Sequence, residues 1–333
     1  SRDAGRNWED VTPQGIGKWG TVNMIDLSAH DAGRAFVAVH RYRLDDFKPY
    51  IYGTNDFGKT WSLLTDGTNG IPSNHFVRVV REDPDRKGLL YAGSEFGLYA
   101  SFDDGAHWQS LQLNLPVTPI TDLAVHQKDL VVATQGRSFW ILDDLTPLHQ
   151  LSAEVAQSKA YLFAPRDAYR LTAGPRRRSG NTNTFRDRVN GSALDWDRVG
   201  EDGPAGAVIY YYLASSSDDL QMEILESDGD VIKTFSKGEE LPGKKGMNRF
   251  VWDMHYPDAD VIPNTSFRGT TRGPKAVPGS YQVRLTVGGE SQAQSLKILK
   301  DPRVESSVAD LQEQFDFLIQ IRDAITETYD AIK

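Results

Sequence analysis

The sequence predicts a mainly β protein, and three observations carry this prediction. Its 333 residues include 29 Gly and 16 Pro, so turns are frequent, and 39% of the residues are apolar, which is enough for packed cores. An octet with Asp, Gly and Trp at fixed positions occurs three times within the first 108 residues. A sustained helical spacing of apolar residues occurs only after residue 305.

The repeated octets are "SRDAGRNW" (1–8), "TNDFGKTW" (54–61) and "SFDDGAHW" (101–108). A catalytic site normally occurs once in a fold, so a repeated motif is more typical of architecture. The glycine gives the positive φ of a hairpin, the aspartate accepts hydrogen bonds from its own turn, and the tryptophan supplies a large apolar face. The second acid of the third octet, Asp104, is expected to be an exposed turn residue. The residues predicted to hold these turns are Asp3, Gly5, Trp8, Asp56, Gly58, Trp61, Asp103, Gly105 and Trp108.

The octets follow one another at intervals of 53 and 47 residues, which are typical of the blades of a β-propeller. Short strand-like segments of alternating polarity fill the intervals. Residues 1–150 are therefore predicted to be the last three or so blades of a propeller, and 134–145 its degenerate final unit. A propeller needs at least four blades, and three alone would leave an exposed edge. Because Ser1 falls inside an octet, we expect the rest of the propeller in the same parent chain or in a second chain.

Residues 151–206 are predicted to be an exit segment followed by a long strap loop. The loop is polar, rich in turn residues and long, which is typical of a functional loop or of a strap over neighbouring surface. Its run of Arg176, Arg177 and Arg178 could contact an anion, although such a run is more often simply solvated.

Residues 207–300 are predicted to form an immunoglobulin-like β-sandwich, because six or seven short segments alternate in polarity with a period of two. An Asp-Gly pair at 228–229 indicates a hairpin, and Trp252 is expected in the core. Residues 301–333 are predicted to be an amphipathic helix that is truncated. Ser307 and Asp310 form a capping-box pattern at its start. The apolar stripe comprises Leu311, Phe315, Leu318, Ile321, Ile325, Tyr329 and Ile332.

The octets resemble Asp-boxes, the bacterial-neuraminidase repeats (BNR) of sialidases, xyloglucanases and sortilin-like propellers. Nearly the whole chain resembles the C-terminal part of bacterial exported proteins called sortilin-like or BNR-repeat glycosyl hydrolases. The stretches that carry this resemblance include "RYRLDDFKPYIYGTNDFGKTW", "DLVVATQGRSFWILDDL", "GMNRFVWDMHYP" and "VPGSYQVRLTVGG". The resemblance implies a fold and an extracytoplasmic location, either periplasmic or secreted. It brings no catalytic residues with it.

Composition excludes several other classes of function. A net charge of −9 argues against a nucleic-acid binder, and no run approaches the roughly 18 apolar residues of a membrane helix. Without cysteine there is no disulfide or thiolate metal site, and the seven histidines show no ligand spacing. "GIGKWG" (15–20) fits a dinucleotide-binding pattern, but a strand-like segment follows it instead of a helix. We therefore expect no metal and no cofactor.

The function predicted best is a non-catalytic binding or scaffold protein whose propeller face binds a peptide, a protein or a glycan. One alternative is a glycoside hydrolase, sialidase- or xyloglucanase-like, completed by the missing blades. Such enzymes use two carboxylates about 5 to 9.5 Å apart. Glu95, in "GSEFG" between two predicted strands, is the catalytic candidate. A second alternative is a structural subunit of a larger assembly.

Overall fold

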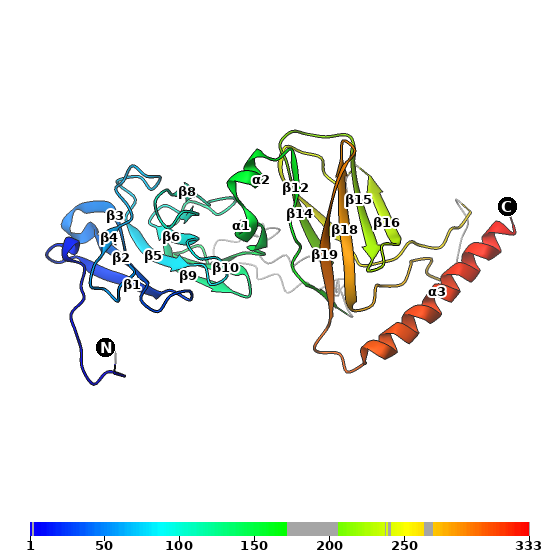
Figure 1. The fold of residues 1–333 in the computed structure, drawn as a ribbon, viewed down its shortest axis with the longest axis horizontal. Coiled ribbons are helices and arrows are strands. Elements are labelled where there is room, and N and C mark those ends of the chain that lie inside the picture. The colour runs from blue at the N-terminus through cyan, green and yellow to red at the C-terminus, as the bar shows by residue number, and fades with distance from the viewer. Residues whose placement is uncertain (2, 172–205, 237, 239–240, 263–268, 333) are drawn as a thin grey trace, which may run out of the picture. The chain divides into compact units, whose positions relative to one another are not determined.

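The computed structural model describes residues 1, 3–171, 206–236, 238, 241–262 and 269–332. The protein is mainly β and divides into two compact units, Ser1–Leu145 and Thr146–Lys333 (Figure 1). The predicted anion contact at Arg176, Arg177 and Arg178 lies outside the described residues.

The first unit contains three antiparallel sheets, each built from strands that are consecutive in the chain. The first sheet comprises β1 (Thr21–Leu27), β2 (Ala35–Arg41), β3 (Asp46–Thr54) and β4 (Ser62–Leu63). The second comprises β5 (Val77–Glu82), β6 (Leu90–Ser94), β7 (Leu98–Ser101) and β8 (Gln109–Ser110). The third comprises β9 (Ile120–His126), β10 (Asp129–Thr134) and β11 (Phe139–Leu142). Two short 3-10 helices, Gln14–Ile16 and Tyr42–Leu44, precede β1 and β3.

The three sheets pack against one another in chain order, since β5 contacts β1 and β2, and β9 contacts β5 and β6. One apolar cluster joins the first two sheets, with Phe36 and Ile51 on one side and Val80, Leu90 and Trp108 on the other. Strand β6 is buried along its whole length because it is covered on both faces. This arrangement explains why β6 reads as a continuous apolar segment instead of an alternating one.

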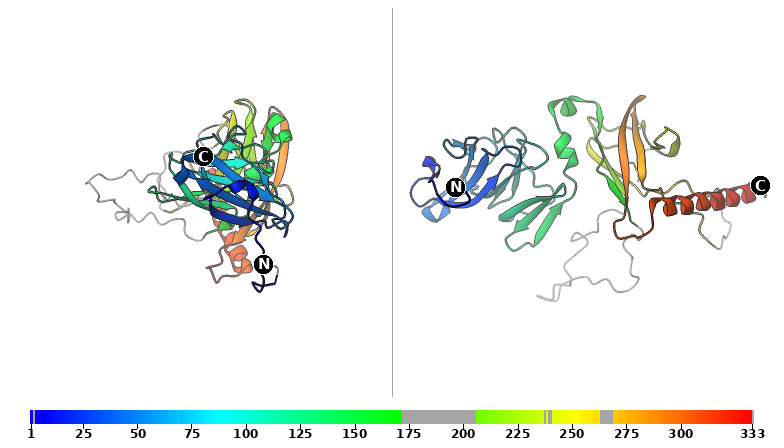
Figure 2. Two further views of the ribbon diagram at one scale, coloured as in Figure 1. Left: turned by 90° about the vertical axis from the view of Figure 1, so that its left-hand side faces the viewer. Right: turned by 60° about the horizontal axis from the view of Figure 1, so that its bottom comes forward.

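The second unit contains two sheets that share one hydrophobic core. The smaller sheet has the order β12 (Ala160–Leu162), β14 (Ala207–Leu213) and β17 (Gly246–Trp252). The larger has the order β13 (Ala168–Arg170), β19 (Glu290–Lys300), β18 (Gly279–Val287), β15 (Leu220–Glu226) and β16 (Val231–Ser236). Two short helices, α1 (Thr146–Gln150) and α2 (Ala153–Gln157), precede β12. Figure 2 shows β18 and β19 as a long hairpin, drawn in orange.

Both sheets of the second unit contribute to its core, with Ile209 and Trp252 from one sheet and Met222 and Val283 from the other. Trp252 is fully buried. Strand β12 of the smaller sheet and strand β13 of the larger sheet come from the stretch that the sequence predicts to be an exit segment. β13 pairs in parallel with β19, more than 120 residues further along the chain, and such pairing leaves no local pattern in the sequence.

Helix α3 (Val308–Asp330) begins with a capping box, in which Ser307 Oγ accepts from Asp310 N and Asp310 Oδ2 accepts from Ser307 N. Only part of the expected apolar stripe is covered. Leu311 is buried and the Phe315 ring contacts the Tyr256 ring at 4.7 Å, but Leu318 is exposed, as is Ile321. In the second half of the helix, Thr326 Oγ1 accepts from Asp260 N at 3.1 Å.

Candidate functional site

The three octets form the same hydrogen-bonded turn. In the second octet, the Asp56 carboxylate accepts from Thr60 N at 2.9 Å and from Thr60 Oγ1 at 2.6 Å, while Thr54 Oγ1 accepts from Gly58 N at 3.0 Å. Asp3 and Asp103 make the corresponding bonds in their own octets. Hydrogen bonds from Thr60, first from its side chain and then from its backbone, lower the pKa of Asp56 to about 2.

The tryptophan of an octet reaches the segment that follows the preceding octet. Trp61 Nε1 donates to Val11 O at 2.7 Å, and Trp108 Nε1 donates to Leu64 O at 3.1 Å. Val11 and Leu64 are equivalent, since each stands three residues after an octet tryptophan, Trp8 or Trp61. We call this repeated bond the inter-sheet tryptophan contact.

The octet glycines add to this contact by allowing close approach. At Gly58, which has φ +80°, an added Cβ would lie 2.8 Å from Val11 Cβ. At Gly105, with φ +87°, an added Cβ would lie 3.0 Å from Leu64 Cδ1. Any larger residue would therefore be strained by its own backbone and would push the neighbouring segment away.

The first octet and the first sheet lack such a neighbour among the described residues. Trp8 is 82% exposed, whereas Trp108, in the equivalent position, is 4% exposed. Strand β1 likewise exposes Ile25 and Leu27, whereas the apolar residues of β5 are fully buried against the first sheet. These exposed side chains line a groove of about 630 Å³ that also includes Val11 and Phe57.

A buried ion-pair network forms a second tie between the first two sheets. Arg34, immediately before β2, is 5% exposed, and its Nε donates to Glu82 Oε1 at 3.1 Å. Its Nη1 donates to Asn55 Oδ1 at 3.1 Å and to Asp104 Oδ2 at 3.0 Å, and Nη2 also binds Asp104. Asp104 is therefore a half-exposed ion-pair partner, and sequence reasoning missed Arg34 because its partners lie 48 and 70 residues away.

A further arginine connects the first strands of all three sheets. Arg81 in β5 donates to Asp26 Oδ1 of β1 at 2.8 Å and to Asp122 Oδ1 of β9 at 3.1 Å. It also donates to the backbone oxygen of Leu123 at 2.7 Å. The acids on these strands are thus engaged in holding the sheets together.

The predicted catalytic acid, Glu95, lies in the turn between β6 and β7. Its Oε2 accepts from Nε and Nη2 of Arg78 at 2.9 and 2.6 Å, and Arg78 is its only side-chain partner among the described residues. The Arg78 guanidinium lies over the Phe76 ring at 5.1 Å and the Tyr42 ring at 5.7 Å. In the described part of the chain, no second carboxylate is hydrogen-bonded or ion-paired to this group.

Aromatic rings surround this ion pair. Tyr42 stacks on Phe76 at 4.7 Å, and His40, which is 5% exposed, contacts Tyr42 at 4.8 Å. His40 Nδ1 is buried and has no hydrogen-bond partner among the described residues. Burial, followed by the nearby charges of Arg78 and Arg43, lowers the pKa of His40, which favours the neutral ring.

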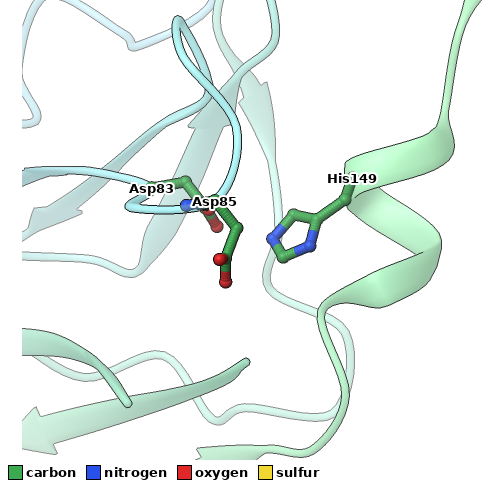
Figure 3. A group of neighbouring side chains, drawn as sticks. All are labelled: Asp83, Asp85 and His149. Atoms are coloured by element: carbon green, nitrogen blue, oxygen red, sulfur yellow. Dashed lines mark hydrogen bonds between the residues drawn. The ribbon is translucent and has the colours of Figure 1, made fainter. Parts of the chain in front are cut away.

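Two further acids lie in the turn between β5 and β6 (Figure 3). Asp83 is fully buried and accepts from Tyr91 Oη at 2.7 Å and from Asp85 N at 2.8 Å. Burial and then the Asp83 charge raise the pKa of Tyr91. Figure 3 also draws His149, which belongs to α1 in the second unit. Within either unit by itself, no three His, Asp or Glu side chains of the described residues converge closely enough to hold a metal ion.

No protein-family model matches the chain, and no curated protein matches it. Among solved structures, it is similar to the GH74 enzyme of Niastella koreensis, at 12% identity and a TM-score of 0.31, over 83% of this chain and 46% of that one. An ancestral GH74 enzyme matches at 12% identity and a TM-score of 0.27, over 82% of this chain and 35% of that one. CopC from Methylosinus trichosporium OB3b matches at 12% identity and a TM-score of 0.19, over 30% of this chain and 81% of that one.

The chain spans less than half the length of both GH74 enzymes. Among the described helices, none combines the length and the apolar character needed to cross a membrane.

Proposed function

We propose that this chain is a non-catalytic binding and scaffold protein, with residues 1–145 forming consecutive Asp-box blades of a β-propeller. The observation that carries this proposal is the inter-sheet tryptophan contact, which repeats with the same register between Trp61 and Val11 and between Trp108 and Leu64. The Trp108–Leu64 bond joins the second sheet to the first, and the Trp61–Val11 bond joins the first sheet to the segment that precedes it. A radial array of blades requires an equivalent contact at each step.

The groove beside β1 is the surface on which a further Asp-box sheet would pack. It exposes Ile25, Leu27 and Trp8, the same kinds of side chain that the second sheet buries against the first. A contiguous apolar patch of this kind is typical of an interaction surface. The occupant would come from the same parent protein or from a second chain.

A peptide, protein or glycan is the ligand class that the aromatic cluster supports. Phe47 and Phe96 are exposed near the Arg78–Glu95 pair, and they contact Phe76 and His75 at ring-centroid distances of 6.3 and 4.6 Å. Exposed aromatic rings beside an arginine are common at binding surfaces. The glycoside hydrolase alternative stays a prediction, because it requires a second carboxylate near Glu95.

We also propose that residues 207–300 form an immunoglobulin-like sandwich that β12 and β13 extend, and that α3 is an amphipathic helix. An extracytoplasmic location in a bacterium, periplasmic or secreted, and the lack of a nucleic-acid partner complete the proposal.

The experiment that tests the proposal is the intact mass and subunit composition of the natively purified protein. A parent chain or a stable partner carrying further Asp-box sheets would support it. A monodisperse monomer of 333 residues would contradict it. The variant I25K/L27K should abolish the assembly without changing the melting of the isolated chain, because both side chains are exposed in it. V231K, at an exposed apolar position of β16, is the matched control and should leave the assembly intact.

A further inference from the structure

The second unit contains a pocket of about 590 Å³ between α3 and the segment that leads into Lys275. Its walls come from the end of β13, from Asp253 and His255 after β17, from residues 270–275 and from one face of α3. The volume is in the range of small-molecule sites in proteins. We call it the basic pocket.

Arg170 is the most unusual residue of the basic pocket. It is only 9% exposed, and its Nε donates to Ala276 O at 2.9 Å. Among the described residues, this carbonyl is its only hydrogen-bond acceptor, and no carboxylate pairs with it. A buried guanidinium without a counter-ion is unfavourable, so its two Nη groups call for an anion.

A second cation of the basic pocket, Lys275, also lacks a carboxylate partner in the described part of the chain. Its Nζ donates to Leu171 O at 3.0 Å. Burial, followed by repulsion from Arg170 and Arg272, lowers the pKa of Lys275. An anion bound between the two cations would relieve this repulsion.

The other charges that face the basic pocket already compensate one another. Arg272 Nη2 donates to Asp253 Oδ2 at 2.7 Å, and Arg322 pairs with Asp323 at 2.6 Å. His255 Nδ1 is hydrogen-bonded to Gly273 O at 2.7 Å, and burial lowers the pKa of His255, which favours its neutral form. Asp253 also acts on Lys275 through its charge, but among the described residues no carboxylate forms an ion pair with Arg170 or Lys275.

The wall that α3 contributes is mainly apolar. Leu318, Ile321 and Ile325 face the basic pocket, and Leu318 and Ile321 are exposed. A ligand that covered them would remove apolar surface from water, which is favourable. The basic pocket thus combines the cations Arg170 and Lys275 with an apolar wall from α3.

We propose that the basic pocket binds a small amphiphilic anion, with a carboxylate or phosphate head on Arg170 and Lys275 and an apolar chain along Leu318 and Ile321. The arginine fork and the lysine ammonium suit either head group. This site is separate from the propeller face and does not depend on the function proposed for it.

The test is calorimetric titration of the full chain with octanoate and with octyl phosphate, which separate the two head groups. Octanol, which has no charge, and acetate, which has no chain, should each bind at least about tenfold more weakly than octanoate. K275Q should weaken octanoate about tenfold or more, because one charge-assisted bond is lost. K297Q makes the same change at an exposed position of β19 and should leave the affinity unchanged.

A second measurement separates binding at the head-group site from general adsorption to α3. The Lys275 ammonium, followed by NMR, should titrate at a higher pH when octanoate saturates the protein. The proposal is overturned if octanol binds as tightly as octanoate, if K275Q binds octanoate as tightly as the wild type, or if neither octanoate nor octyl phosphate binds at millimolar concentration.

Discussion

Replacing Trp108 by alanine is the sharpest test of the inter-sheet tryptophan contact. The side chain is 4% exposed, belongs to the apolar cluster between the first two sheets and donates to Leu64 O. Removing a buried tryptophan lowers the free energy of unfolding by about 3–5 kcal/mol. The loss is larger here because Leu64 O loses its hydrogen bond from Trp108 Nε1. For a unit of this size, such a loss lowers the melting temperature by about 10 °C or more.

The matched control is W8A, since Trp8 holds the same position in the first octet but is 82% exposed. In the isolated chain, W8A should change the stability by no more than about 0.5 kcal/mol. Differential scanning calorimetry is the assay, because the two units can unfold in separate transitions and only that of the first should move. The reasoning fails if W8A destabilises as much as W108A, or if W108A costs less than about 1 kcal/mol.

Four other predictions concern charged residues of the first unit. The pKa of Asp56 is held at about 2, below the ordinary 3.8, so its contribution to stability is present above pH 3.8 and is lost as the pH falls through about 2. The melting temperature of wild type should therefore fall more steeply over that window than that of D56N, and equal slopes would contradict the assignment. R34M should cost about 3–5 kcal/mol in urea unfolding, because it leaves Glu82 buried and unpaired, and R34M/E82M should recover much of that loss. D104N should cost less than about 1 kcal/mol, since this partner is half exposed. E95Q should leave any turnover of aryl glycosides unchanged, and hydrolysis that the wild type performs and E95Q abolishes would favour the glycoside hydrolase alternative.

The sequence predicts the features of this protein that depend on residues close together in the chain. The octet turns are held by bonds between residues two to four positions apart, such as those of Asp56 with Thr54 and Thr60. The short strand-like segments expected between the octets are present as strands, such as β5 and β6 between the second octet and the third. Alternation and turn chemistry act over short distances, so they leave a readable pattern.

Features that depend on tertiary contacts could not be predicted in this way. Strand β13 has only three residues, and it is a strand because it pairs with β19. Arg34 and Arg170 look like ordinary arginines in the sequence, and only the fold brings one to its carboxylates and leaves the other without any. The apolar stripe expected along α3 includes Leu311, which is buried, and Leu318, which is exposed, because the spacing within a helix does not specify which of its turns a neighbouring segment covers.

The repeated tryptophan contact also has a consequence for how the first unit fluctuates. The main contacts between the described sheets run from the first to the second and from the second to the third, so we expect cooperativity chiefly between neighbouring sheets. The second sheet, β5–β8, has a neighbour on both sides, whereas among the described residues the first has one only. Amide protons of the second sheet should therefore exchange with solvent most slowly, and opening should begin in an outer sheet and spread inward.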